Sequence, residues 1–306
     1  MRIVLFASSD FALPLLESLN NSPNEIVAVY TQPPSISGRG LRLKYNSIAE
    51  RAQELSLNIC YPVRVNESQE LVYFAELEAD VAIVAAYGQI LSEKLLSLPR
   101  FGFLNLHPSL LPRWRGAAPI ERAIIEGDNI TGVCTIKMVN QLDAGPILAK
   151  EIVQITPDIT AKSLSKLLSK IGASQVLSTL NNLFTLSEIP QSNIGIKYAK
   201  KISKKETRIN WKSPAEIVDR LIRGLSPSPG SWSLINGSRF KILGSRVIDL
   251  IGNPGHRIKV SEEDTSLIIA CGKKAIFISS IQKEGKRPLT GKEFILGYRG
   301  SKVKFE

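Results

Sequence analysis

Three side chains of this sequence have the chemistry needed for acyl transfer to an amine: Asn105, His107 and Asp143. Asn105 and His107 stand two residues apart at the end of an apolar run, and side chains at that spacing on a strand point the same way. An amide N–H can stabilise an oxyanion by about 3–4 kcal/mol. An imidazole can move a proton near neutral pH, and a carboxylate can orient it or take the amine proton through water. We therefore predict that the three side chains converge on one catalytic site.

Each of these residues also has a structural interpretation when it is taken alone. A single histidine can be a satisfied core residue, an Asp before Ala-Gly can belong to a turn, and Asn105 can simply end a strand. The sequence also leaves open how His107 and Asp143 divide the role of general base, because the distance between them is unknown.

The length is sufficient for two domains with separate cores, and the composition is typical of a soluble globular protein. Of its 306 residues, 43% are hydrophobic and 22% are charged. No apolar run approaches the roughly 18 residues of a membrane span, and the apolar N-terminus is too short for a signal peptide. Cys60, Cys134 and Cys271 are far apart and odd in number, which favours a reducing compartment. We predict a cytoplasmic protein that binds no membrane and, since no metal-ligand spacing is present, no metal.

The positive charge lies almost entirely in the second part of the chain. Residues 1–190 hold 16 Lys and Arg against 18 Asp and Glu, whereas residues 191–306 hold 23 against 10. The net charge of +11 is thus the sum of a nearly neutral first part and a second part at +13. A basic surface of this size favours a polyanionic partner such as nucleic acid, although it can also serve solubility alone.

Short apolar runs alternate with helical patterns in the first half of the chain. The predicted strands are 3–7, 26–31, 81–86, 103–107, 132–139 and 147–155, and the predicted helices are 11–19, 45–55, 93–96, 116–126 and 160–184. This alternation predicts an α/β fold with a doubly wound, Rossmann-like and mostly parallel sheet. Ligands of such sheets bind at the carboxyl ends of the strands, where Asn105 and His107 fall. The first turn lacks Gly-x-Gly-x-x-Gly, which argues against a dinucleotide site.

The second half has a different pattern. After a predicted helix at 214–223, five short strands are expected at 231–235, 239–243, 257–260, 266–270 and 275–281. Such a series favours a small β-barrel of the oligonucleotide-binding (OB) type. We predict a catalytic domain at 1–188, a polar linker at 189–206 and an OB-like barrel domain at 207–306.

The run that contains the Asn–His pair resembles a known family signature. It reads Asn105-Leu106-His107-Pro108-Ser109-Leu110-Leu111-Pro112-Arg113-Trp114-Arg115-Gly116. With Asp143 downstream, it is similar to the signature of the folate-dependent formyltransferases. Further segments that match this family lie along most of the chain, at 31–33, 38–40, 85–91, 198–211, 229–232 and 282–287. The sequence of residues 113–120 most resembles the branch of the family that formylates methionyl-tRNA.

The resemblance assigns roles to individual residues. It implies that Asn105, His107 and Asp143 are the catalytic trio. It implies that the formyl donor, 10-formyltetrahydrofolate, is bound by two segments, whose members are Ser109, Leu110, Leu111 and Pro112, and Tyr87, Gly88, Gln89 and Ile90. An apolar turn with free backbone groups suits a flat pterin ring. We also expect Trp114 to pack, with Arg113 and Arg115 exposed.

The resemblance further implies that the acceptor is the free amino group of methionyl-initiator tRNA. The residues expected to contact the tRNA are Arg39, Arg42, Lys44, Lys204 and Lys205. An alternative keeps the folate chemistry and changes the acceptor to an amino-sugar nucleotide. A non-catalytic RNA-binding protein is disfavoured, because none of the trio is lost. We expect a monomer.

Overall fold

The computed structural model describes residues 1–37, 42–298 and 303–306. In these residues the chain divides into two compact units. The first comprises residues 1–116, 130–154 and 165–198, and the second comprises residues 117–129, 155–164 and 199–306. No helix among the described residues is both long and apolar enough to cross a membrane.

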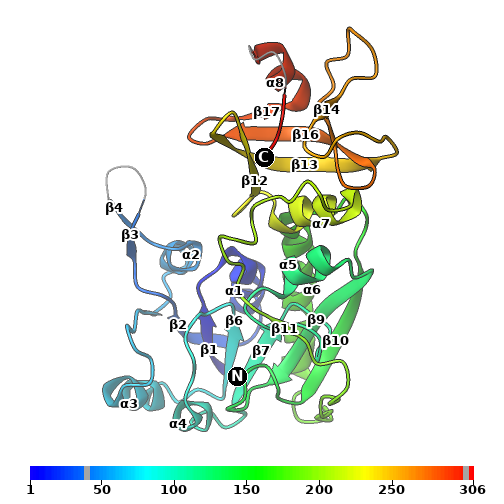
Figure 1. Cartoon of the computed structure of the whole chain (residues 1–306). Helices are drawn as coiled ribbons and strands as arrows, with labels where there is room; N and C mark the ends of the chain where they lie inside the picture. The colour runs from blue at the N-terminus through cyan, green and yellow to red at the C-terminus, as the bar shows by residue number, and fades with distance from the viewer. Residues whose placement is uncertain (38–41, 299–302) are drawn as a thin grey trace. The chain divides into compact units, whose positions relative to one another are not determined.

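The first unit is built around one sheet, and helices connect several of its strands along the chain (Figure 1). Its strands are β1 (Arg2–Ala7), β2 (Glu25–Tyr30), β5 (Ile59–Cys60), β6 (Val81–Ala85), β7 (Phe103–His107), β9 (Ile130–Lys137) and β10 (Ile147–Gln154). Its helical segments are η1 (Asp10–Ala12), α1 (Leu13–Asn20), α2 (Ser47–Glu54), α3 (Ser68–Glu76), α4 (Glu93–Leu96) and most of α6 (Ala161–Asn181). Short strands lie at β3 (Ser35–Ser37), β4 (Arg42–Lys44) and β8 (Arg115–Gly116).

The order of the main sheet places β9 and its turn to β10 beside β7, the strand that carries Asn105 and His107. The strands run β10-β9-β7-β6-β1-β2-β5. The pairs from β7 to β5 are parallel, whereas β9 is antiparallel to both β7 and β10. Strand β9 ends opposite Leu104, near the start of β7, and the turn that follows folds back over β9 to bring Asp143 to Asn105. The core on one face is aromatic, with Phe6 and Tyr30 stacked at 4.6 Å.

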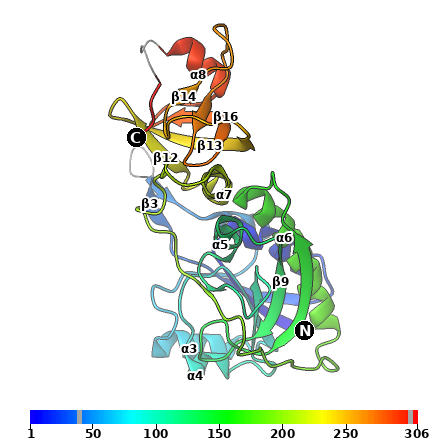
Figure 2. The ribbon, with the colours of Figure 1, turned by 45° about the vertical axis from the view of Figure 1, so that its right-hand side comes forward.

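The second unit contains a curled antiparallel sheet. Its elements are α5 (Pro119–Glu126), α7 (Ala215–Leu225), β12 (Ser231–Ile235), β13 (Ser238–Ile248), β14 (Arg257–Ile258), β15 (Ile268–Ala270), β16 (Ala275–Lys283), β17 (Pro288–Thr290) and α8 (Gly291–Gly297). The division of the chain falls within β11 (Tyr198–Ala199). The strand order is β12-β13-β16-β15-β14, with β17 on β16. Figure 2 shows α7 beside β13, where its apolar face is buried.

The last residues of the chain join the two edges of this sheet. Phe305 bridges Ile235 at the end of β12, and Lys304 bridges His256 just before β14. The predicted fold class, a mostly parallel α/β sheet followed by a barrel-like antiparallel sheet, is confirmed. The domain boundaries predicted at 188 and 206 stay a prediction.

Several elements were not predicted from the sequence. Strand β5 has two residues, and β3 and β4 have three each, which is too short for a period-2 pattern to be visible. The first predicted helix begins as a 3₁₀ turn capped by Ser9, because Pro14 at the start of α1 favours a new helical segment there. Helices α3 and α8 were also missed.

One ion pair in the second unit makes a testable contribution to stability. Arg122 Nη1 lies 2.6 Å from Glu206 Oε1, and this hydrogen bond, with help from the Ser203 backbone, lowers the pKa of Glu206 from 4.5 to about 2. A carboxyl group whose pKa is lowered by folding stabilises the folded state at pH values above its unfolded pKa. This contribution is lost as the pH falls from 4.5 toward 2.

We therefore expect Glu206→Gln to lower the free energy of unfolding at pH 7 by about 1 kcal/mol or less, since the pair is partly exposed. Urea titrations at several pH values should show this difference shrinking to nothing near pH 2. The exposed Glu263→Gln serves as control. A difference that stays constant down to that pH would show that the pair contributes nothing through its charge.

Candidate active site

Strand β7 presents Asn105 and His107 on the same face at its carboxyl end. It pairs in parallel with β6 and antiparallel with β9, where Asn105 lies opposite Ile136 and His107 lies opposite Cys134. Both side chains are largely buried, with 8% of Asn105 and 4% of His107 exposed. Two polar side chains this deep in an apolar sheet need partners, because an unpaired buried polar group is costly.

Those partners come from the turn between β9 and β10, which carries Asp143. Asn105 Nδ2 donates to Asp143 Oδ1 at 3.2 Å, and the Gly116 backbone N–H donates to Asp143 Oδ2 at 2.8 Å. The same Oδ2 lies 3.7 Å from His107 Nδ1, which is the range of an ion pair rather than of a hydrogen bond. The structure thus brings the three predicted catalytic side chains together around one carboxylate.

The other nitrogen of His107 is already engaged. Nε2 lies 2.8 Å from the Trp114 backbone carbonyl. A carbonyl oxygen only accepts, so Nε2 must carry the hydrogen, and in the neutral ring the lone pair then resides on Nδ1. The nitrogen that faces Asp143 is therefore the one left for proton transfer. The carboxylate is placed to stabilise the charge that the ring gains when Nδ1 takes a proton.

Two residues of the site adopt backbone conformations that are unusual for their types. Trp114 has φ +68° and Asp143 has φ +46°. Left-handed conformations of residues other than glycine cost about 1–3 kcal/mol each and persist only where surrounding contacts hold them. At Trp114 this conformation coincides with the carbonyl contact to His107. No local sequence pattern signals either residue.

The prediction that Arg115 is exposed is wrong. Only 4% of Arg115 is exposed, and its Nε and Nη2 both donate to Gln191 Oε1, at 3.1 and 2.8 Å. The reason lies 76 residues further along the chain, where a local interpretation of Arg-Trp-Arg could not find it. The expectation that Trp114 packs is confirmed, since it is 5% exposed, with the Arg113 guanidinium 4.4 Å from its ring centre.

The predicted folate segment at 87–90 is held mainly through its side chains. The Tyr87 ring is buried edge-on against Phe6, and burial raises the pKa of its hydroxyl. Gln89 is bonded to the backbone of Val65 and Pro62, whereas Ile90 is 83% exposed. Gly88 is exposed with φ +95°. A ligand at this segment would therefore meet backbone groups and Ile90 rather than the Tyr87 ring.

The predicted folate segment at 109–112 is similar. Ser109 Oγ donates to the Arg113 carbonyl at 2.7 Å, and Leu111 packs in a small buried cluster on β9 and β10. The peptide bond between Leu111 and Pro112 is cis. Leu110 and Pro112 are half-buried and remain the members with accessible surface. Whether these residues contact a folate stays a prediction.

The predicted tRNA-binding residues are only partly described. Arg39 and the side chain of Arg42 lie outside the described residues. Lys204 and Lys205 are exposed in the second unit. Lys44 is exposed in the first unit and helps to line a hollow of about 310 Å³. The other lining residues follow β1 and β2 or precede α2, and are Ser8, Gln32, Pro33, Ser35, Tyr45 and Asn46.

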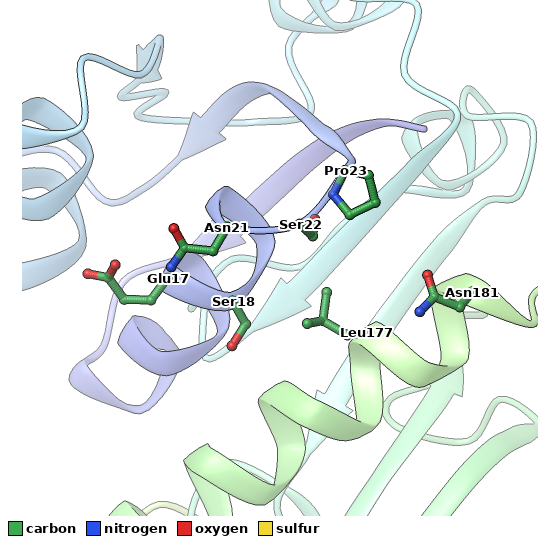
Figure 3. Close-up of a pocket in the computed structure, with 7 residues that line it drawn as sticks. All are labelled: Glu17, Ser18, Asn21, Ser22, Pro23, Leu177 and Asn181. Carbon is green, nitrogen blue, oxygen red and sulfur yellow. The ribbon is translucent and has the colours of Figure 1, made fainter.

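Two other features carry no comparable chemistry. A hollow of about 450 Å³ lies between the end of α1 and α6 (Figure 3), but its one titratable group, Glu17, is already paired with Arg51.

Burial raises the pKa of the Cys134 thiol to about 11, so this neighbour of His107 stays protonated near neutral pH and is a poor nucleophile. Among the described residues, no group of three or more His, Cys, Asp or Glu is gathered as a metal site.

Comparison with known families identifies the relationship. The family described as formyl transferase matches residues 1–180, and the formyl transferase C-terminal domain matches residues 201–299. The chain belongs to the formyl transferase family. The resemblance predicted from the run 105–116 is thereby confirmed. Gln191 lies between the two matched regions.

Curated relatives cover nearly the whole chain. It is 44% identical over 297 residues to the methionyl-tRNA formyltransferase of Roseobacter denitrificans, which covers 97% of this chain and 96% of the relative. It is 43% identical over 298 residues to the methionyl-tRNA formyltransferase of Ruegeria pomeroyi, with 97% of both chains covered.

Solved structures share the fold at lower identity. WlaRD, a sugar 3N-formyl transferase solved in the presence of dTDP and 5-N-formyl-THF, has a TM-score of 0.65 at 19% identity, covering 94% of this chain and 99% of its own. HypX from Aquifex aeolicus, solved with tetrahydrofolic acid, has a TM-score of 0.65 at 16% identity; all of this chain is covered, and it spans 51% of HypX.

The geometry predicts the effect of changing the carboxylate. Asp143→Asn keeps the shape of the side chain, but its NH2 group must face either the Gly116 N–H or the Asn105 amide, and the charge opposite His107 is lost. We expect turnover to fall by about 100- to 10,000-fold. Asn105→Ala and His107→Ala should each cause losses of similar order.

Steady-state kinetics of formyl transfer measures these losses, and thermal melts check that the variants fold. The exposed Asp249→Asn is the matched control and should be unaffected. Near-normal turnover in any one of the three variants would remove that residue from the mechanism.

Proposed function

We propose that this protein transfers the formyl group of 10-formyltetrahydrofolate to the free amino group of methionyl-tRNA. One observation carries the proposal: the Asp143 carboxylate is held by Asn105 and Gly116 and faces His107 Nδ1 at the end of β7. The acceptor is supported by the relatives named methionyl-tRNA formyltransferase, which match at 43–44% identity over nearly the full chain.

The reaction joins the amine nitrogen to the formyl carbon and breaks the bond from that carbon to the folate nitrogen. Negative charge develops on the formyl oxygen as the amine attacks. One amide hydrogen of Asn105 is used on Asp143, and the second is left to stabilise this oxyanion. Because Asp143 fixes the amide, the donor does not have to reorganise during the reaction.

A proton must also leave the attacking amine and reach the leaving nitrogen. We propose that this proton moves through the pair of His107 and Asp143, with Nδ1 as the ring atom that takes part. Nε2 stays bonded to the Trp114 carbonyl and keeps the ring in place. The burial of both side chains limits the access of water, which strengthens the interaction between them.

The donor is proposed to lie against the backbone of Tyr87 and Gly88, with Leu110 and Pro112 supplying apolar surface. The support is the exposure of Gly88 and Ile90 and the half-buried Leu110 and Pro112. The fold is shared with a structure solved with tetrahydrofolic acid. No step of this proposal requires a metal.

The finer identity of the acceptor is proposed from charge. The net +13 of residues 191–306, with Lys204 and Lys205 exposed, favours a tRNA over a nucleotide of few charges. We propose the initiator tRNA as the acceptor and a monomer acting in the cytoplasm, where aminoacylated tRNA is available.

The acceptor can be identified directly. We expect incubation with 10-formyltetrahydrofolate and a set of aminoacylated tRNAs to yield formylmethionyl-tRNA from the initiator species. Acid gels or mass spectrometry of the aminoacyl group would detect the product. Formylation of an amino-sugar nucleotide, with no reaction on any tRNA, would replace the proposed acceptor by the alternative one.

Salt dependence gives a second test of the polyanionic acceptor. Each phosphate neutralised by a lysine or arginine makes the negative slope of log K against log salt steeper by about 0.9 for a duplex. We expect tRNA binding to weaken steeply with salt, and Lys204→Ala with Lys205→Ala to make the slope shallower by about 1–2. Glu262→Gln is an exposed control. A flat salt response would contradict a polyanionic acceptor.

A further inference from the structure

We propose that Gln191 is a positioning residue of the reaction, which holds the turn that carries Asp143 and is itself held by Arg115. The inference deepens the proposed function and rests on it for the role of Asp143. Gln191 does not touch the trio side chains. It contacts the backbone on which the Asp143 carboxylate is mounted.

All the hydrogen-bonding groups of the Gln191 amide are used. Nε2 donates one hydrogen to the Asp143 carbonyl and one to the Gly145 carbonyl, both at 2.8 Å. Oε1 accepts from Nε and Nη2 of Arg115. Arg115 can only donate, so the oxygen of the amide must face it and the NH2 group must face the turn. The orientation of the amide is therefore fixed by chemistry.

Arg115 connects this amide to the second contact of the carboxylate. It immediately precedes Gly116, whose N–H donates to Asp143 Oδ2. Its own N–H donates to the Lys197 carbonyl at 2.9 Å. Arg115 thus connects its neighbour Gly116, which binds the Asp143 side chain, to Gln191, which binds the Asp143 backbone. A buried guanidinium held by two hydrogen bonds gives a rigid anchor.

The turn needs such support because its backbone is strained and crowded. Asp143 has φ +46°. A Cβ at Gly145 would lie 1.7 Å from the Lys137 carbonyl oxygen, so the turn passes directly over β9. Contacts from outside the turn can hold this geometry, and the two carbonyls that Gln191 bonds flank Ala144.

The segment that carries Gln191 is itself attached to the sheet. Ile189 exchanges two backbone hydrogen bonds with Ile147 at the start of β10, at 2.8 and 3.0 Å. The segment lies outside both matched family regions and within the predicted linker at 189–206. It is thus a part of the site rather than only a connection.

Two substitutions test the donor and acceptor groups of the Gln191 amide. Gln191→Ala removes both donors and the acceptor, whereas Gln191→Glu keeps an acceptor for Arg115 and removes both donors. We expect each to lower kcat by roughly 10- to 100-fold with KM values changed by less than about threefold, because a displaced catalytic group affects the transition state more than binding. The control is Gln154→Ala, an exposed glutamine at the far end of β10, which should be unaffected.

A double-mutant cycle with Asp143→Ala distinguishes positioning from general stability. If Gln191 acts through Asp143, Gln191→Ala should cause little further loss of kcat in the Asp143→Ala background. Equal losses in both backgrounds, or unchanged kcat in Gln191→Glu, would overturn the proposal. Thermal melts of the full chain establish that each variant is folded.

Hydrogen exchange gives a measurement that does not depend on the acceptor. The Gly116 amide should exchange about tenfold or more faster in Gln191→Ala than in the wild type, because its Asp143 partner is no longer held. Unchanged protection of this amide would contradict the positioning role. A wild-type enzyme that formylates no methionyl-tRNA would overturn the proposed function instead, and the exchange result would still decide the role of Gln191.

Discussion

The site depends on one buried carboxylate whose two oxygens are fixed from different directions. Asp143 Oδ1 accepts from Asn105, and Oδ2 accepts from the Gly116 backbone while facing His107 Nδ1. A carboxylate largely removed from water is costly unless its oxygens are satisfied, so these contacts stabilise the folded site as well as arrange its chemistry. The same contacts orient the amide for an oxyanion and the imidazole for a proton.

The sheet order makes this arrangement possible. A wholly parallel sheet would send the chain after β9 into a crossover, but β9 and β10 run antiparallel at the edge of the sheet and are joined by the turn that carries Asp143. By the register of β7 and β9, this turn leaves the sheet opposite Leu104, near the start of β7, and folds back over β9 to place Asp143 beside Asn105. The run after β7 then supplies the Trp114 carbonyl and the Gly116 N–H. One strand, its exit loop and one hairpin turn thus provide the three predicted catalytic side chains and their direct contacts.

Much of this could be predicted from the sequence, and the rest is missing for physical reasons. The period of two along β7 placed Asn105 and His107 on one face, and strand–helix alternation predicted the parallel sheet. The burial of Arg115 could not be predicted, because its partner Gln191 is distant in the chain and lies in a polar segment that looked like a linker. The packing of the Tyr87 ring in the aromatic core beside Phe6 was also not visible in the sequence, and its contact with the donor stays a prediction. Backbone contacts, such as that of Trp114 with His107, leave no signature in side-chain patterns.

The central claim is that Nδ1 of His107 is the reacting ring nitrogen because Nε2 is committed to a backbone carbonyl. Nitrogen NMR of protein labelled at histidine tests it most directly, since the chain has two histidines and a His256→Asn variant assigns both signals. Under mildly alkaline conditions, the neutral ring of His107 should carry its hydrogen on Nε2, with an unprotonated Nδ1. A ring that carries its hydrogen on Nδ1 would contradict the account.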